Sequence, residues 1–211
     1  MASRKILKIV VAILFSVVAG YLLVNAKAVY RASKYALSPD SIKFEDPLFQ
    51  IAKVNSATFA TGSMVEKIKS EVPENWLLYP ELGIKAPIFW GVSALESNDK
   101  MNYGLTHIQT TALPGNGGEG LISGHSSHYW WQKGDYKEIF ATLLKAKKGD
   151  RFVINKNGLR VYQVDKIYEV GTSDYLDFNA SGQEKIKLMT CVPLGTNLRR
   201  LMVEARLISV L

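Results

Sequence analysis

The chain has 211 residues, of which 47% are hydrophobic, and its formal net charge at pH 7 is +7. This length predicts one domain plus an appendage, and the apolar content is sufficient for a buried core. Six basic residues and no acidic residue lie within residues 1–34, so the rest of the chain has 26 − 6 = 20 basic and 19 acidic residues, a net charge of +1. The domain is therefore nearly neutral. It lacks the basic stripe that nucleic-acid binding needs, and no nucleic-acid partner is expected.

Residues 6–26 form an apolar run, interrupted by Lys8 and Asn25, that predicts a membrane-spanning helix. At about 1.5 Å per residue such a helix is roughly 30 Å long, the thickness of a bilayer core. A secretory signal peptide cleaved after the small-x-small sequence Ala26-Lys27-Ala28 is the alternative. We favour an uncleaved anchor, because the uninterrupted core at residues 9–24 is long for a signal peptide. In both cases the domain is exported, and the anchored protein would be single-pass with its domain outside the cell.

Residues 28–75 are mixed and polar, with prolines at three positions, and predict a stalk with short helices. Ser63 and Glu66 have the spacing of a helix-capping box. The expected organisation is therefore an anchor or signal peptide at residues 1–27, a stalk at 28–75 and the main domain at 76–211.

From residue 76 onward the pattern predicts a mostly β domain. The expected strands are residues 76–79, 84–90, 121–123, 151–154, 159–164, 186–191 and 198–208. Apolar residues in 136–144 recur at i, i+3, i+4, i+7 and i+8, which predicts one amphipathic helix. Residues 168–183 are expected to form a long polar connection. Many short strands with few helices indicate a closed β-barrel, preceded by the transmembrane helix.

Cys191 is the only cysteine of the chain and ends the predicted strand 186–191. Alternation places it on the face of Lys187 and Met189, opposite Ile186 and Leu188. A buried structural cysteine is the common alternative. One cysteine in an exported domain forms no internal disulfide and anchors no structural zinc site, so no metal is expected. The sequence also lacks a P-loop and a dinucleotide fingerprint, and no cofactor is expected.

A nucleophilic cysteine needs a group that moves protons and a donor that stabilises the developing oxyanion. Of the three histidines, His107 is expected in a loop, while His125 directly follows a predicted strand and Gly124. His128 lies three residues further on. Its position directly after a strand therefore makes His125 the best candidate for the acid–base group.

The oxyanion donor is expected to be one of two adjacent arginines, because arginine carries a permanent charge and a planar fork of donors. Along residues 198–208, alternation places Arg200 on the outer face with Met202 and Glu204. Arg199 falls in register with the apolar set. Arg200 should therefore share its face with Cys191, where residues on neighbouring strands can meet.

Two segments together resemble the active site of the sortase family. Leu188-x-Thr190-Cys191, Pro193-x-Gly195-Thr196-Asn197 and Arg200-Leu201-x-Val203 are similar to its active-site strand, loop and closing strand. Ser123-Gly124-His125, after the turn-rich residues 113–118, is similar to the segment that carries the catalytic histidine. The resemblance extends from about residue 76 to 208, with Lys187 at a position where the family usually has threonine.

The resemblance implies a cysteine transpeptidase with a sortase-like barrel as its catalytic domain. Cys191 would be the nucleophile, His125 the acid–base group and Arg200 the oxyanion or substrate donor, with Thr190 a further substrate contact. The implied partners are the sorting-signal peptide of a secreted protein, an amine acceptor on a cell-wall precursor or surface protein, and membrane lipid around the N-terminal helix. Residues 46–49, Asp-Pro-Leu-Phe, are similar to the lid of pilin-type sortases, although a plain turn is the favoured interpretation.

Two alternatives from other functional classes remain open on the same residues. One is a hydrolytic cysteine peptidase, which product analysis with an added amine would distinguish from a transpeptidase. The other is a catalytically inactive, membrane-tethered barrel that binds peptides. In that case the thiol should be inert toward a substrate-like electrophile.

Overall fold

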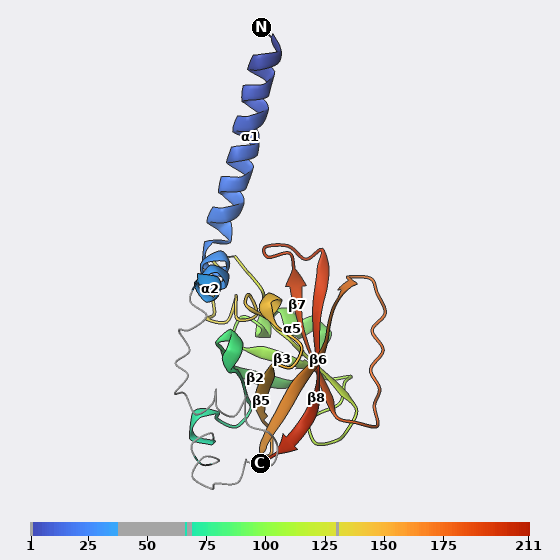
Figure 1. Ribbon diagram of the computed structural model, residues 1–211. Helices are drawn as coiled ribbons and strands as arrows, with labels where there is room; N and C mark the ends of the chain where they lie inside the picture. The colour runs from blue at the N-terminus through green and yellow to red at the C-terminus, as the bar shows by residue number, and fades with distance from the viewer. Residues whose placement is uncertain (1, 38–65, 67–68, 130) are drawn as a thin grey trace.

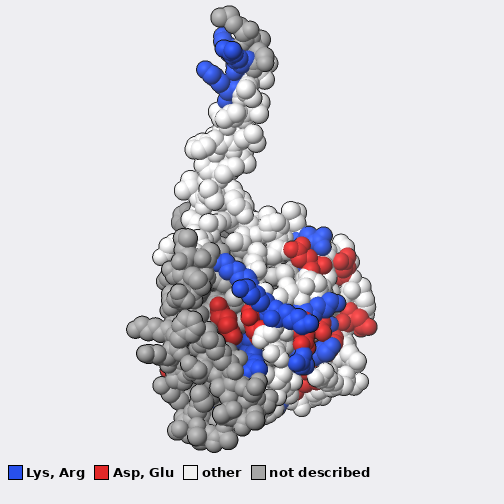
Figure 2. Space-filling view, in the orientation of Figure 1, with Lys and Arg blue, Asp and Glu red and all other residues white. Residues whose placement is uncertain are grey.

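The computed structural model describes residues 2–37, 66, 69–129 and 131–211. Helix α1 (Ala2–Val24) projects away from the barrel, and helix α2 (Ala26–Leu37) lies against one end of it (Figure 1). Basic side chains mark the free tip of α1, followed by a long stretch without charges (Figure 2). The segment Arg4–Val24 is long and apolar enough to cross a membrane, and none of it is buried in the domain. Ser63 and residues 46–49, which carried two of the predictions for the stalk, lie outside the described residues.

The domain consists of short strands joined by loops and short helices. Its strands are β1 (Trp76–Tyr79), β2 (Ile84–Val92), β3 (Leu105–Ile108), β4 (Glu119–Ser123), β5 (Arg151–Asn155), β6 (Leu159–Gly171), β7 (Lys185–Val192) and β8 (Arg199–Val210). Its helices are η2 (Pro80–Leu82), α5 (Ala94–Lys100) and η3 (Leu143–Lys145). These strands close into a barrel in the order β1-β2-β3-β4-β7-β8-β6-β5. The predicted mostly β, closed barrel is confirmed.

Most neighbouring strands are antiparallel, but β2–β3 and β4–β7 are parallel pairs. The parallel β4–β7 pair matters for the site, because it brings the ends of both strands to the same edge of the barrel. The connection that follows β7 lies at the end of the barrel where α2 packs (Figure 1).

The barrel interior is filled by the alternate, inward-facing residues of each strand. A row of aromatic rings crosses it: Tyr79 and Phe152 have ring centroids 5.5 Å apart, and Phe152 and Tyr162 are 5.3 Å apart. The hydroxyls of both tyrosines donate to carboxylates at the barrel's edge. Tyr79 donates to Asp150 at 2.8 Å, and Tyr162 donates to Glu184 at 2.5 Å. This satisfies polar groups that would otherwise be costly to bury.

The predicted amphipathic helix at residues 136–144 is wrong. Apolar residues of this segment, such as Phe140, are buried, but successive N–H groups bond to carbonyls three residues back, and only η3 is helical there. The Phe140 N–H instead donates to the His125 carbonyl at 2.9 Å, and the Thr142 hydroxyl donates to the Leu82 carbonyl at 2.9 Å. Tertiary partners thus replace the hydrogen bonds that an α-helix would have made.

Other elements also differ from the sequence prediction. Residues 105–108, expected as a loop around His107, form strand β3. Strand β6 continues to Gly171, so the long connection covers only residues 172–184. Helix α5 was not predicted. Its residues show little apolar periodicity, but Ser93 caps it by accepting from the Glu96 N–H at 3.3 Å.

Candidate active site

Cys191 is the second-last residue of β7, and its side chain is half-buried. Burial alternates along this strand: Leu188 and Thr190 are buried in the interior, whereas Met189 and Cys191 are partly exposed. The thiol therefore lies on the outer face at the strand's end, as the alternation predicted. This position gives a substrate access to the sulfur from outside the barrel.

Arg200 is paired directly with Cys191 across the antiparallel β7–β8 ladder. Directly opposed side chains on one face lie about 5 Å apart at Cβ. The Arg200 Nη1 donates to the Asn197 carbonyl at 3.0 Å, and this bond holds the guanidinium against the β7–β8 loop. The neighbouring Arg199 instead pairs with Glu169 at 2.8 Å on the surface. The strand register inferred from the sequence is confirmed.

His125 is positioned by the parallel β4–β7 ladder. That ladder pairs residues 66 positions apart, from Glu119↔Lys185 to Ser123↔Met189. Gly124 extends it, because its N–H donates to the Met189 carbonyl at 3.1 Å. His125 is the next residue, and the same offset of 66 positions corresponds to Cys191. The end of β7 that carries Cys191 thus lies between the strand of Arg200 and the segment that leads to His125.

Gly124 allows this arrangement because it has no side chain. A Cβ at this position would approach side-chain carbons of Leu105 and Phe140 to 2.7 Å, which real contacts do not reach. The Thr190 hydroxyl donates to the Gly124 carbonyl at 2.8 Å, and Thr190 is 2% exposed. Thr190, predicted as a substrate contact, therefore faces the barrel interior and ties β7 to the histidine segment.

The imidazole of His125 is held neutral by its surroundings. Burial, and secondly the charge of His128, lower the pKa of His125 to about 4, although a hydrogen bond with the Asn98 carbonyl opposes this shift. The two histidine rings lie edge to face with centroids 4.6 Å apart. A carbonyl oxygen can only accept, so the 3.2 Å contact between His125 Nε2 and Asn98 O places the proton on Nε2. The lone pair is then on Nδ1, where it can accept a proton.

The other two histidines have different surroundings. His107 is 1% exposed, and its Nδ1 accepts from the Gly91 N–H at 3.4 Å while Nε2 lies 3.0 Å from the Ala112 carbonyl. Burial lowers the pKa of His107, consistent with a neutral histidine that holds the β3–β4 connection. His128 lies beside His125, and burial together with Lys137 lowers its pKa.

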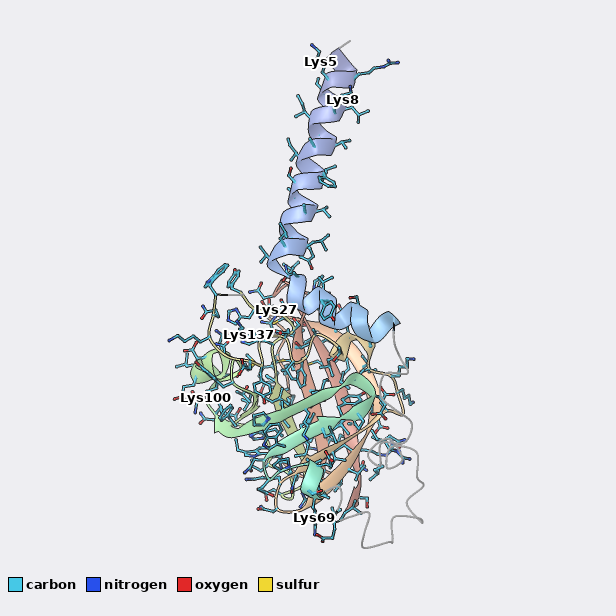
Figure 3. All side chains as sticks on the ribbon, turned by 90° about the vertical axis from the view of Figure 1, so that its left-hand side faces the viewer. Lys5, Lys8, Lys27, Lys69, Lys100 and Lys137 are labelled. Atoms are coloured by element: carbon cyan, nitrogen blue, oxygen red, sulfur yellow. The ribbon has the colours of Figure 1, made fainter. Side chains whose placement is uncertain are left out.

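The N-terminal helices pack against this end of the barrel. The Tyr21 hydroxyl, near the end of α1, donates to the Leu194 carbonyl in the β7–β8 loop. Asn25 is 8% exposed and lies against Gly195, whose N–H donates to the Ser127 hydroxyl at 2.8 Å. Figure 3 shows Lys27 at this junction, with Lys5 and Lys8 near the far tip of α1. The loop that follows Cys191 and the segment that follows His125 are therefore joined to each other, and that loop also contacts the end of α1.

Sequence reasoning did not identify Asn98, Ser127 or the contacts of α1 as parts of this site. Asn98 acts through its backbone carbonyl, which no residue type reveals, and Ser127 contacts the backbone of a segment 68 residues away. Within the described ranges, which omit residues 38–65, no group of three or more His, Cys, Asp or Glu is placed to hold a metal ion.

The comparison with protein families identifies this barrel. A family model described as "Sortase domain" matches residues 77–208, which is more than half of the chain. The chain belongs to the sortase family. Sortases are cysteine transpeptidases, so membership of the family supports an enzymatic function.

Solved structures agree with this assignment. The pilus-related sortase C of Group B Streptococcus is 27% identical with a TM-score of 0.55, over 88% of this chain and 91% of that chain. Sortase C1 from Streptococcus agalactiae is 23% identical with a TM-score of 0.53, over 87% and 89%. A lid mutant of sortase A from Corynebacterium diphtheriae is 23% identical with a TM-score of 0.53, over 82% and 95%. The last two likenesses concern the fold alone. Among curated proteins no match was found.

Proposed function

We propose that this sortase is a membrane-anchored cysteine transpeptidase that cleaves a C-terminal sorting signal and transfers the acyl group to an amine. The observation that carries the proposal is the alignment of three strands at one edge of the barrel. Cys191 is paired with Arg200 on β8, and the register of β4 leads to His125 on its other side. A thiol, a neutral imidazole and a guanidinium supply the nucleophile, the base and the oxyanion donor that acyl transfer needs.

In the first half-reaction, Cys191 Sγ attacks the carbonyl carbon of a threonine in the sorting signal. Nδ1 of His125 accepts the thiol proton as the S–C bond forms. The tetrahedral oxyanion is stabilised by the guanidinium of Arg200. When the C–N bond breaks, the proton passes from His125 to the leaving amine, and the C-terminal fragment departs. The product on the enzyme is a thioester at Cys191.

In the second half-reaction, an amine on a cell-wall precursor or another surface protein attacks the thioester. His125 removes a proton from the attacking amine, the C–S bond breaks and the thiol is restored. The result is a new amide bond between the secreted protein and its acceptor. Water in place of the amine would give the hydrolytic alternative from the same intermediate.

We also propose that the catalytic domain, residues 76–211, lies outside the cell, joined by a stalk at 28–75 to a single-pass anchor at 1–27. The apolar segment Arg4–Val24 supports the anchor. The hydrogen bond from Tyr21 to Leu194 supports an orientation in which the Cys191 edge faces the membrane. Such an orientation suits a precursor protein that is itself held at the membrane surface when it is cleaved.

Product analysis with and without an added amine tests the transfer step. The full-length enzyme in detergent is incubated with a sorting-signal peptide and triglycine, and the products are separated by mass. A peptide–triglycine amide that forms at the expense of the free acid supports a transpeptidase. Free acid alone, at every triglycine concentration, would identify a hydrolytic peptidase.

A further inference from the structure

Lys187 is the feature of β7 that the proposed mechanism does not use. It lies four residues before Cys191 on the same outer face, yet it is only 8% exposed. Lysine is seldom buried to this degree unless its charge is paired. Its cover comes from the loop at residues 172–184, which runs along the outside of the barrel from β6 to β7 (Figure 1).

Two groups neutralise and cover the Lys187 ammonium. Its Nζ lies 2.7 Å from Glu119 Oε2, on the first residue of β4, and 5.0 Å from the ring centre of Phe178 in the loop. The first contact is a short, charge-assisted hydrogen bond, and the second is within cation–π range. Lys187 therefore links a barrel strand to the loop.

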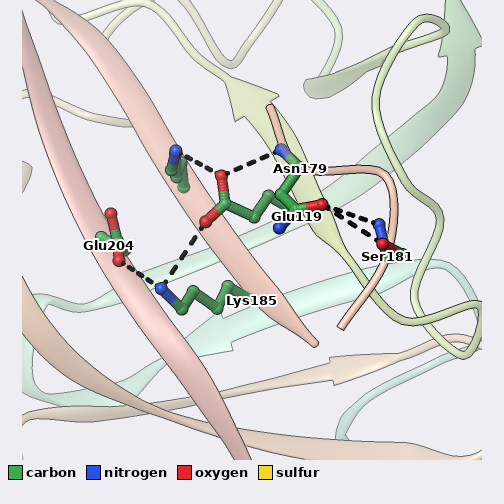
Figure 4. Close-up of polar contacts among 6 residues, drawn as sticks. Glu119, Asn179, Ser181, Lys185 and Glu204 are labelled. Carbon is green, nitrogen blue, oxygen red and sulfur yellow. Dashed lines mark hydrogen bonds and ion pairs between the residues drawn. The ribbon is translucent and has the colours of Figure 1, made fainter. Parts of the chain in front are cut away.

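Glu119 holds the same loop by two further bonds. Its N–H donates to the Asn179 carbonyl at 2.7 Å, and its Oε2 accepts from the Asn179 N–H at 3.4 Å. Lys185 reaches the other carboxylate oxygen at 3.6 Å and Glu204 at 3.0 Å (Figure 4). Burial alone would raise the pKa of Glu119, but the hydrogen bond and charge of Lys187, aided by Asn179 and Lys185, hold it below its ordinary value.

The contacts that hold this loop to β4 and β7 lie in its second half. Beyond the contacts of Phe178 and Asn179, the Gly118 N–H donates to the Gly182 carbonyl at 3.2 Å. The first half of the loop is exposed, and Tyr175 is 90% exposed. That half leaves β6 at Gly171, which pairs with Arg199, the neighbour of the residue opposite Cys191. The loop therefore spans from the catalytic edge to Lys187.

A peptide that bound at Cys191 and continued along the outer face of β7 would run toward this loop. Four residues of extended peptide span about 13 Å, which matches the separation of Cys191 and Lys187 along their strand. The outer-face residue between these two is Met189, which is half-buried. A substrate backbone on this strip would meet the loop at the Lys187 end, where Phe178 and Asn179 lie.

We infer that Lys187 is a positioning residue, which with Glu119, Phe178 and Asn179 forms a clamp that fixes the loop beside the peptide-binding strip. This inference rests on the proposed function for the position of the peptide. The clamp acts on peptide affinity, because it contacts the loop and not the reacting atoms. Loss of the clamp therefore weakens binding and leaves the reactivity of the thiol unchanged.

The test compares Lys187→Met with Lys185→Met in the full-length protein in detergent. Lys185 is the matched control, since it shares Glu119 but pairs with Glu204 instead of the loop. The probe is acetyl-Ala-Pro-Ala-Thr chloromethyl ketone, whose inactivation constants KI and kinact report binding and reaction separately, and iodoacetamide reports the bare thiol. Lys187→Met should raise KI by about fivefold or more, the range of couplings transmitted between neighbouring elements. The kinact and the iodoacetamide rate should stay within about twofold of wild type.

Hydrogen exchange of the loop amides gives a second, independent measurement. In Lys187→Met the amides of residues 172–180 should exchange faster, and Lys187→Arg, which keeps the charge and can stack on Phe178, should restore both KI and exchange. The double variant Lys187→Met/Glu119→Gln also removes the carboxylate that loses its 2.7 Å partner, and it should show the same rise in KI without a loss of Tm.

Two results would overturn the inference: equal effects of Lys187→Met and Lys185→Met on KI, or wild-type exchange of the loop in Lys187→Met. Failure of the wild type to show saturable inactivation would count against the proposed function instead. If the wild type fails in this way, hydrogen exchange still tests the clamp. Faster exchange of the loop in Lys187→Met would support the clamp, and unchanged exchange would refute it.

Discussion

The buried, neutral state of His125 predicts an unusual pH dependence. Because its pKa is lowered to about 4, roughly 90% of His125 should be neutral at pH 5, against roughly 3% for an unperturbed histidine. We therefore expect kcat/KM to fall by less than about twofold between pH 7 and pH 5 on account of this group. An ordinary exposed histidine in the same role would lose about 25-fold.

The assay is the initial rate of cleavage of a fluorogenic sorting-signal peptide from pH 4 to pH 8. His128→Gln is the matched perturbation: the charge of His128 is the second cause of the lowered pKa, so the acid limb should move upward when it is removed. The depressed pKa of His125 contributes stability that is complete above pH 6.5 and is lost as the pH falls through about 4. Circular dichroism at each pH therefore separates protonation from unfolding. An acid limb near pH 6.5 in the wild type would refute this account of His125.

Three further predictions concern the arginines, Glu81 and the anchor. Arg200→Ala should lower kcat/KM by on the order of 10²-fold or more without rescue by lysine, whereas Arg199→Ala should be mild; the reverse order in steady-state kinetics would refute the assignment. Burial raises the pKa of Glu81 to about 7, so its stabilising contribution is complete below pH 4.5 and is lost as the pH rises through 7. Glu81→Gln should therefore raise the free energy of unfolding at pH 8 by up to about 3 kcal/mol, and much less at pH 4.5; equal changes at both pH values in chemical denaturation would contradict this. Protease treatment of intact cells should digest the protein from about residue 28 onward, and a protected domain would contradict the anchor.

Much of the barrel could be predicted because its strands carry local signals. The alternation of Leu188, Met189 and Thr190 gave the face of Cys191, and the same pattern along β8 selected Arg200 over Arg199. The structure confirms that register, since Cys191 and Arg200 are direct partners. Alternation is a reliable guide here because one face of each strand packs into the core.

Where the prediction failed, long-range partners determined the structure. Strand β3 is short and contains Thr106 and His107, which look unsuited to a core until their partners are known. Ser97 lies 2.7 Å from the Thr106 hydroxyl, and the backbone of Gly91 and Ala112 satisfies His107. The segment around Phe140 differs in the opposite way. Its apolar residues have the spacing of an amphipathic helix, but they are buried in a series of irregular turns.

The contacts around Lys187 could not be predicted either. Its nearest charged partner, Glu119, is 68 residues away in the sequence, and no local pattern links the two. That the segment leading to His125 runs beside the end of β7 was indicated only by family resemblance until the parallel β4–β7 register was known.

The central claim, that Cys191 forms an acyl-enzyme, is tested most directly by intact-mass spectrometry of the full-length protein during turnover of a sorting-signal peptide. We predict an adduct with the mass of the N-terminal peptide fragment on Cys191, which disappears when triglycine is added and is absent from Cys191→Ala. The Cys191→Ala protein should remain folded, with a change in stability within about 1–2 kcal/mol. Substantial turnover by Cys191→Ala, or turnover of the wild type with no adduct at Cys191 even after rapid acid quenching, would contradict the account.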